Sequence, residues 1–394
     1  MQYRAAMKAG RRGGILWVTR DNSAPHPYLV EACRRAGAEV RELHWAEEFE
    51  GERPIGRFVE LGRHTGRKHP MSFKLVSPRL LARFARAAED VAIFYELGLV
   101  GLYAGLSKLI RRRGLISLVE GDYQDLGRTG TAGAKVALRR LAARSVDLFI
   151  ANNPRAEQYL VDTLKVPRSR IVTGWWLAGL PSDLAARAPA DVTTATDGAP
   201  LFVCASRLIA PKGIDLLIEA VAIHRRETGP CTVWIMGDGP EREHLTELAC
   251  RLGVEDSVVF LGTVDPGTLK GALELCDALV FPTLQDLLGR VVVEALTVGT
   301  PVVLSPMTGA AGTVVRDGVN GLIVDPRDPR ELARALARFA EPQTRLALRD
   351  GACRSSAMLA PDAVAALILR SVALVRDRRE ATESRRHESA RLPR

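Results

Sequence analysis

The fold is decided by the stretch Ala278-Leu-Val-Phe-Pro-Thr-Leu-Gln-Asp-Leu-Leu-Gly-Arg-Val-Val-Val-Glu294. Its first four residues form an apolar strand, and a helix is predicted from near Gly289 to about Val298. In a parallel α/β sheet, the loop between them lies at the carboxyl ends of the strands, where ligands bind. The helix start offers free N–H groups and a positive dipole end, which suit a phosphate. The stretch thus predicts a phosphate loop with two acids, Asp286 and Glu294.

Apolar strands alternate with helices on both sides of this stretch, and 394 residues are too many for one ordinary core. We therefore predict an α/β protein with two Rossmann-like domains whose parallel sheets face each other across a cleft. The expected parts are an N-terminal domain (1–185), a linker (186–199), a C-terminal domain (200–345), helices that pack back toward the N-terminal domain (346–378) and a disordered basic tail (379–394). Residues 47–70 are polar and are expected to form a loop.

The positive charge is concentrated in the first half of the chain. Residues 1–185 hold 30 Lys and Arg against 19 Asp and Glu, whereas residues 186–394 hold 25 against 27. This excess favours an anionic partner, and peripheral contact with an anionic membrane surface is one prediction; a solvated, arginine-rich surface is the alternative. Nucleic acid is disfavoured, because the basic residues occur without interleaved aromatic residues.

The six cysteines show no C-x-x-C pair and no metal-site spacing. No Asp-x-Asp motif appears at a strand end, so no essential metal is expected. Cys204, Cys231 and Cys276 lie in or beside apolar segments and are predicted to be core residues. This usage favours a reducing cytoplasm. No signal peptide is recognised, and no uninterrupted apolar run is expected to span a bilayer.

Three loops of the C-terminal domain carry the chemistry, and all are expected at one edge of the sheet. Arg207 and Lys212 follow the strand over 201–205, and their cationic groups suit a diphosphate. Glu294 can accept hydrogen bonds from a ribose hydroxyl pair, and Asp286 can reach polar hydroxyls beyond the phosphates. Gly237 begins the third loop, Gly-Asp-Gly-Pro. A phosphate, a ribose and a hydroxylated group in line describe a nucleotide-sugar.

Residues 201–339 resemble the donor domain of family 4 of the GT-B glycosyltransferases, which are retaining enzymes. The resemblance is carried by Arg207-Leu, Lys212-Gly213, Gly237-Asp-Gly-Pro240, Phe260-Leu-Gly-Thr-Val264, Pro282 to Ala295, Gly299-Thr-Pro-Val302 and Asp317-Gly-Val-Asn-Gly321. It implies a donor site made by Arg207, Lys212, Gly237, Val264, Asp286, Leu287, Leu288, Gly289, Arg290 and Glu294. The first domain, which resembles the family only loosely, would bind the acceptor.

Two positions depart from the family pattern. The family usually has Glu where this chain has Asp286, which leaves the preferred sugar open. Many relatives have a His directly after the strand that matches 115–119, where this chain has Glu120. Glu120 is a candidate for orienting the acceptor or the transferred sugar, and a polar loop residue is the alternative. Asn22, His26 and Asp122 are further acceptor-side candidates.

The sequence therefore predicts a retaining glycosyltransferase that moves a hexose-type sugar from a UDP- or GDP-linked donor to an acceptor hydroxyl of a lipid carrier, a glycan or a small metabolite. The predicted catalytic residues are Asp286, Glu120, Arg207 and Lys212. No cofactor is expected besides the donor. A nucleotide-sugar epimerase or hydrolase on the same fold, or a non-catalytic nucleotide-sugar-binding protein, is the alternative.

Overall fold

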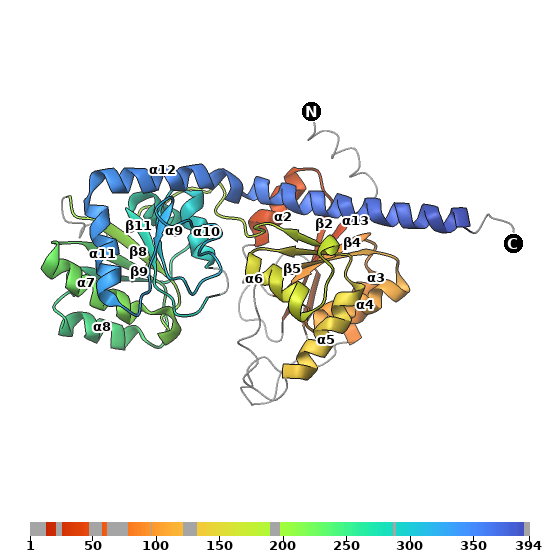
Figure 1. The fold of residues 1–394 in the computed structure, drawn as a ribbon, viewed down its shortest axis with the longest axis horizontal. Helices are drawn as coiled ribbons and strands as arrows, with labels where there is room; N and C mark the ends of the chain where they lie inside the picture. Colours follow the sequence, from red (N-terminus) through yellow and green to blue (C-terminus); the bar gives the residue numbers. More distant parts are fainter. Residues whose placement is uncertain are drawn as a thin grey trace. The chain divides into compact units, whose positions relative to one another are not determined.

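The computed structural model describes residues 13–20, 26–46, 57–60, 78–95, 97–120, 132–189, 198–286 and 289–389 (Figure 1). The chain forms two compact units. One contains Met1–Trp176 together with Val364–Arg394, and the other contains Leu177–Ala363. Each unit is built on one parallel sheet, so the predicted α/β class is confirmed.

The first unit has a seven-stranded sheet in the order β3-β2-β1-β4-β5-β6-β7. Its strands are β1 (Ile15–Arg20), β2 (Val40–Ala46), β3 (Arg57–Glu60), β4 (Val91–Tyr95), β5 (Gly114–Val119), β6 (Leu148–Ala151) and β7 (Ile171–Thr173). Its helices are α2 (His26–Arg35), α3 (Pro78–Arg86), α4 (Leu99–Ile110), α5 (Ala132–Ser145) and α6 (Pro154–Gln158), the last continuing as a π-helical turn over Tyr159–Thr163. Strands β4, β5 and β6 are almost wholly buried, which explains their continuous apolar sequences.

Two expectations for this unit are wrong. Residues 47–70 were expected to form a loop, but Arg57–Glu60 is a strand that pairs in parallel with β2 at the sheet edge. The tail after residue 378 was expected to be disordered, but helix α13 runs from Pro361 to Ser389. Its anchor is Arg376, whose guanidinium donates two hydrogen bonds to the Asp90 carboxylate at 2.7 and 2.8 Å. Composition alone did not reveal this long-range ion pair.

The second unit has a six-stranded sheet in the order β10-β9-β8-β11-β12-β13. Its strands are β8 (Leu201–Ala205), β9 (Thr232–Met236), β10 (Val258–Gly262), β11 (Ala278–Phe281), β12 (Val302–Leu304) and β13 (Gly321–Ile323). Its helices are α7 (Ile214–Glu227), α8 (Arg242–Arg251), α9 (Pro266–Leu275), α10 (Arg290–Thr297), α11 (Pro329–Ala337) and α12 (Pro342–Leu359). This strand order, three outward and three back, is that of a dinucleotide-binding sheet.

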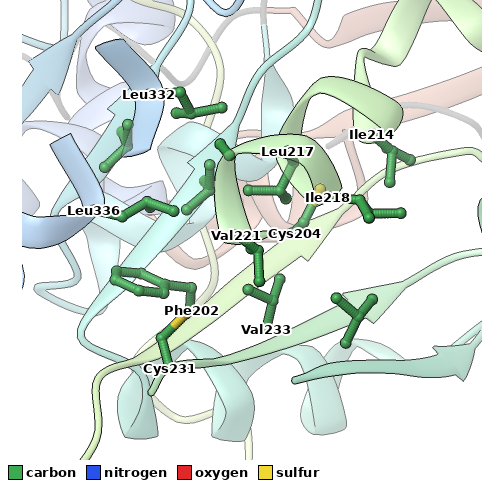
Figure 2. Close-up of a cluster of buried hydrophobic side chains, with 14 of the residues drawn as sticks. Phe202, Cys204, Ile214, Leu217, Ile218, Val221, Cys231, Val233, Leu332 and Leu336 are labelled. Carbon is green, nitrogen blue, oxygen red and sulfur yellow. The ribbon is translucent and has the colours of Figure 1, made fainter. Parts of the chain in front are cut away.

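The core of the second unit lies between its sheet and helices α7 and α11 (Figure 2). Ile214, Leu217, Ile218 and Val221 recur at helical spacing, so one face of α7 is apolar and buried. Phe202 of β8 meets Phe339 edge-on, with ring centroids 5.9 Å apart.

The three cysteines predicted to be core residues are buried. Burial raises the pKa of the Cys204 thiol to about 12, because a thiolate would lose its hydration there. These thiols are therefore protonated packing groups at neutral pH.

The second unit begins earlier in the chain than the expected residue 200, because Leu177 and the segment expected to be a linker belong to it. Lys270 of α9 holds the incoming segment, because its buried ammonium donates to the carbonyl oxygens of Ser182 and Leu184 at 3.0 and 2.6 Å. A Cβ on Gly271 would lie 2.0 Å from the Arg187 carbonyl oxygen. The segment therefore packs against α9 so closely that only glycine fits there.

One helical run, over 342–385, is long and apolar enough to cross a membrane by length and composition alone. That criterion tolerates charged residues, and Asp362 and Arg370 interrupt the apolar residues of the run, so the expectation that no uninterrupted apolar run is long enough is not contradicted. Part of the run is buried: Val364, Ile368 and Val372 of α13 lie in the protein interior.

Gly271→Ala should destabilise the second unit by about 2 kcal/mol or more, because the added methyl group meets backbone rather than a flexible side chain. Gly133→Ala in α5 is the matched control, since a Cβ there has nothing within 4 Å. It should be neutral or stabilise by up to about 1 kcal/mol, as alanine favours helix. Urea unfolding followed by circular dichroism compares the two variants, and equal effects would contradict the proposed close approach.

Candidate functional site

The candidate site lies where the strand order of the second sheet reverses, between β8 and β11. Where the strand order reverses, the loops after the two adjacent strands turn to opposite faces of the sheet. A crevice forms between these loops at the carboxyl ends of the strands. The loop after β8 ends at Lys212 and Gly213, before α7, and the loop after β11 runs from Pro282 toward Gly289, before α10. The predicted site residues of both loops therefore meet at one sheet edge.

Backbone contacts hold these two loops together. The Pro211 carbonyl oxygen accepts from Leu284 N at 2.9 Å and from the Thr283 hydroxyl at 3.0 Å. A Cβ at position 213 would lie 2.3 Å from the Pro282 carbonyl oxygen. Gly213 also has a φ of +62°, so glycine is required there by both geometry and space. The loops form one rigid edge.

Lys212 and Asp286 form an ion pair across this edge. Their Nζ and Oδ2 atoms are 2.5 Å apart, and the two side chains are 14% and 21% exposed. The ammonium also lies 5.5 Å from the centre of the Phe281 ring, which favours a cation electrostatically. This pair is more sheltered than a surface ion pair and is correspondingly less screened by salt.

Asp286 also organises the start of α10. Its Oδ1 accepts from Gly289 N at 2.8 Å, which satisfies one of the free N–H groups at that helix end. Its carbonyl oxygen accepts from Gly309 N at 3.3 Å, so the loop after β12 supports it from the other side. The Asp286 carboxylate thus lies between Lys212 and the start of α10. These are the two groups that the sequence predicts to bind a phosphate.

Glu294 lies in the middle of α10 and is 6% exposed. Its Oε1 is 3.1 Å from Nε of Arg290, one turn earlier. Burial raises the pKa of Glu294, and the Arg290 charge opposes that shift only in part. A buried carboxylate with a single cationic partner retains capacity to accept hydrogen bonds from a polar ligand group.

The loop after β9 packs directly on the loop after β8. Gly237 N donates to the Gly262 carbonyl oxygen at 2.7 Å, and a Cβ at position 237 would lie 1.9 Å from the Ser206 carbonyl oxygen. Gly237 therefore supports the site by close packing. Arg207, the next residue in the first loop, is exposed, and Val264 is partly exposed.

In the first unit, Glu120 directly follows β5 and is partly buried. Its carbonyl oxygen accepts from the Asn153 side chain at 2.8 Å, and Asn153 also caps α6. Burial, and secondarily the Glu120 charge, raises the pKa of Tyr95, so the tyrosine lies close enough to sense the carboxylate. Glu120 therefore belongs to a structured strand end.

Four predicted residues, Asn22, Asp122, Leu287 and Leu288, lie outside the described residues. His26 opens α2, and its side chain is likewise not described.

Sequence reasoning missed two supports of the site: Phe281 beneath Lys212, and the loop after β12, which contacts Asp286. The apolar strand over 302–304 was recognised, but nothing in it signals that the following loop turns toward Asp286. Within the described ranges, no group of three or more His, Cys, Asp or Glu side chains is placed to hold a metal ion.

A family model matches most of the second unit. Residues 190–351 match the family model "Glycosyl transferases group 1". The match spans the three loops that form the candidate site. This region is therefore similar to the group 1 glycosyl transferases.

Solved structures show the same fold over nearly the whole chain. HepE of Anabaena in complex with UDP has a TM-score of 0.69 at 19% identity, covering 91% of this chain and 99% of that one. WaaG, a glycosyltransferase involved in lipopolysaccharide biosynthesis, has a TM-score of 0.65 at 16% identity, covering 91% and 99%. These similarities confirm the predicted GT-B architecture.

Curated relatives are similar over different lengths. The lipopolysaccharide core biosynthesis glycosyltransferase LpsE of Rhizobium meliloti is 34% identical over 52% of this chain, which spans 58% of LpsE. A GDP-mannose-dependent phosphatidylinositol monomannoside mannosyltransferase of Mycolicibacterium smegmatis is 28% identical over 86% of this chain and 88% of its own length.

A double-mutant cycle on Lys212→Met and Asp286→Asn should give a coupling free energy of about 1–2 kcal/mol in urea unfolding, because the pair is sheltered and shares a supporting loop. The exposed pair Arg354 and Asp350 on α12 is the control, and its coupling should be below about 0.5 kcal/mol. Equal coupling in both pairs would show that Lys212 and Asp286 do not interact as described.

Glu294→Gln should raise the thermal midpoint at about pH 8 and lose that gain by about pH 4. Because the pKa of Glu294 is raised in the fold, its ionisation opposes folding once the pH exceeds the ordinary glutamate value of 4.5. Glutamine removes that cost, and below this pH both side chains are neutral. Glu247→Gln, at an exposed position of α8, should change the midpoint at neither pH. A midpoint gain that did not depend on pH would refute burial of the charge as its cause.

Proposed function

We propose that this protein is a retaining glycosyltransferase of family 4, which moves a hexose-type sugar from a UDP- or GDP-linked donor to an acceptor hydroxyl. The observation that carries the proposal is the ion pair of Lys212 and Asp286 beside the start of α10, with buried Glu294 further along the same helix. Lys212 matches the diphosphate of such a donor, Asp286 the sugar on one side of it and Glu294 the ribose on the other.

The cationic residues Lys212 and Arg207 would bind the donor diphosphate. A lysine ammonium has three donors, so Lys212 can keep its bond to Asp286 and still donate to phosphate oxygens. Arg207 is exposed at the same edge and offers a planar fork of donors. As the bond to the sugar breaks, negative charge grows on the leaving diphosphate, and both cations stabilise that charge. Each charge-assisted bond contributes about 1.5–3 kcal/mol.

Asp286 and Glu294 take the hydroxyl groups of the donor. Each Asp286 oxygen already accepts one hydrogen bond, from Lys212 or from Gly289, which fixes the carboxylate in one orientation. The remaining lone pairs can accept from sugar hydroxyls. Glu294 is held by Arg290 and would accept from the ribose. Fixing both acids before the donor arrives reduces the ordering cost of binding.

The comparisons support a nucleotide-sugar donor and a glycan or lipid acceptor. HepE was crystallised with UDP and with UDP-glucose, and the mycobacterial relative is named for GDP-mannose and a phosphatidylinositol mannoside. LpsE is named for the lipopolysaccharide core. For this chain we propose Glu120 as the acceptor-side or sugar-orienting group, a cytoplasmic location, and no metal or cofactor beyond the donor. Loss of activity on chelation would count against the last point.

Arg207→Ala and Lys212→Ala should each lower turnover by roughly a hundredfold or more, since each removes a contact to the developing charge. Arg207→Ala should leave the thermal midpoint unchanged, because the side chain is exposed. Arg251→Ala, at the exposed end of α8, is the matched control and should retain full activity. Release of nucleoside diphosphate in the presence of acceptor measures the rate, and near-normal rates in either site variant would remove the diphosphate assignment.

Asp286→Glu should alter which donor sugar is accepted, because the longer carboxylate moves the acceptor oxygens outward by about one methylene group. A panel of nucleotide-sugars scored by thermal shift and by product formation measures the preference. An unchanged preference would place Asp286 away from the sugar. Free sugar or an isomerised donor formed without acceptor would instead favour a hydrolase or an epimerase.

A further inference from the structure

Helix α4 of the first unit ends in an exposed apolar face. Leu106, Leu109 and Ile110 are 46%, 84% and 65% exposed. Their spacing of three and four residues places them together on one side of the helix. Val100 and Ala104, on the other side, are buried. The helix is therefore apolar on both faces. Packing within the unit accounts for the buried face but not for the exposed one.

Among the described residues, the helices that pack against α4 carry cations and no acid, whereas α13, which reaches Arg112 through Arg379, also carries Asp377 and Glu380. Helices α3, α4 and α5, which pack beside one another, contain no Asp or Glu (Figure 1). Their exposed cationic residues, with the two that follow α4, are Arg83, Arg86, Arg111, Arg112, Arg140 and Arg144. Arg111 and Arg112 come directly after Ile110, so cations border the apolar face.

The acids that lie just beyond the ends of α3 and α5 are already engaged. They form the pairs Glu89 with Arg41, Asp90 with Arg376 and Asp147 with Lys108. Each of these acids is neutralised by its own partner, and within the described residues none of the six exposed arginines forms an ion pair. Within the described part of the first unit, this helical layer therefore presents a group of exposed arginines.

Leu141 of the neighbouring helix α5 is also exposed, whereas exposed apolar residues of the second unit do not share this setting. Leu346 and Met358 of α12 are 66% and 60% exposed, but they stand apart from one another along the helix. Single exposed apolar residues are ordinary on protein surfaces, whereas a contiguous group marks an interaction site.

We propose that the α4 face, defined as Leu106, Leu109 and Ile110 with Arg111 and Arg112, docks the protein on the surface of an anionic membrane. The apolar side chains would enter the acyl-chain layer of such a surface, and the bordering arginines would contact its phosphate head groups. Nucleic acid would use the cations but would leave the three aliphatic side chains unpaired, since bases stack on aromatic groups. The proposal stands independently of the donor site in the second unit.

Vesicle flotation tests the docking surface directly. The full chain should float with vesicles of phosphatidylcholine and phosphatidylglycerol, and should bind phosphatidylcholine vesicles at least about tenfold more weakly. Leu109→Ser with Ile110→Ser should weaken binding to the anionic vesicles by about tenfold or more, because two side chains lose their burial in the acyl layer. Leu346→Ser with Met358→Ser, equally exposed in the second unit, should bind like the unchanged protein.

Charge reversal provides the second arm. Arg111→Glu with Arg112→Glu should abolish the preference for anionic vesicles, whereas Arg226→Glu with Arg251→Glu, exposed in the second unit, should preserve it. Failure of the full chain to float, binding that neither α4 variant weakens, or tighter binding to duplex DNA than to anionic vesicles would overturn the proposal. UDP and GDP binding by every variant is measured in parallel and should not change, which separates a failure of this surface from a failure of the donor site.

Discussion

The second unit depends on the contact between the loops after β8 and β11. At the point where the strand order reverses, the Pro211 carbonyl oxygen accepts from both Thr283 and Leu284, and the Lys212 ammonium reaches Asp286 at 2.5 Å. A carboxylate and an ammonium at that distance in a sheltered place stabilise each other only if both loops keep their positions. The backbone contacts provide that rigidity, and the charges then become a fixed feature of the crevice.

This arrangement suits a ligand that carries both charge and hydroxyl groups. Without the ligand, the Asp286 carboxylate balances Lys212 and caps the start of α10, so neither cation nor helix end is left unsatisfied. A donor diphosphate would add to this network, because lysine has donors to spare and Arg207 is exposed beside it. The buried Glu294 is costly to ionise, and a ribose that donates to it would recover part of that cost. An ionised Glu294 thus lowers the stability of the fold but favours binding of the ribose.

Local sequence patterns predicted much of the fold and part of the candidate site. The apolar strands and the helix start near residue 289 are local signals, and each appears where it was expected. Two features depended on distant partners and were missed. Strand β3 forms because β2 offers an open edge, and α13 continues to Ser389 with its Arg376 bound to Asp90, far away in sequence. The pairing of Lys212 with Asp286 was also missed, since the two were assigned separately to phosphate and sugar.

A structure of the protein with UDP or GDP bound tests the central claim most directly. The account predicts that diphosphate oxygens lie within about 3 Å of Lys212 Nζ and of an Arg207 nitrogen, with the ribose hydroxyls against Glu294. Asp286 should keep its contact with Gly289 N while facing the space beyond the second phosphate. A nucleotide bound elsewhere, or a diphosphate that touches neither cation, would contradict it.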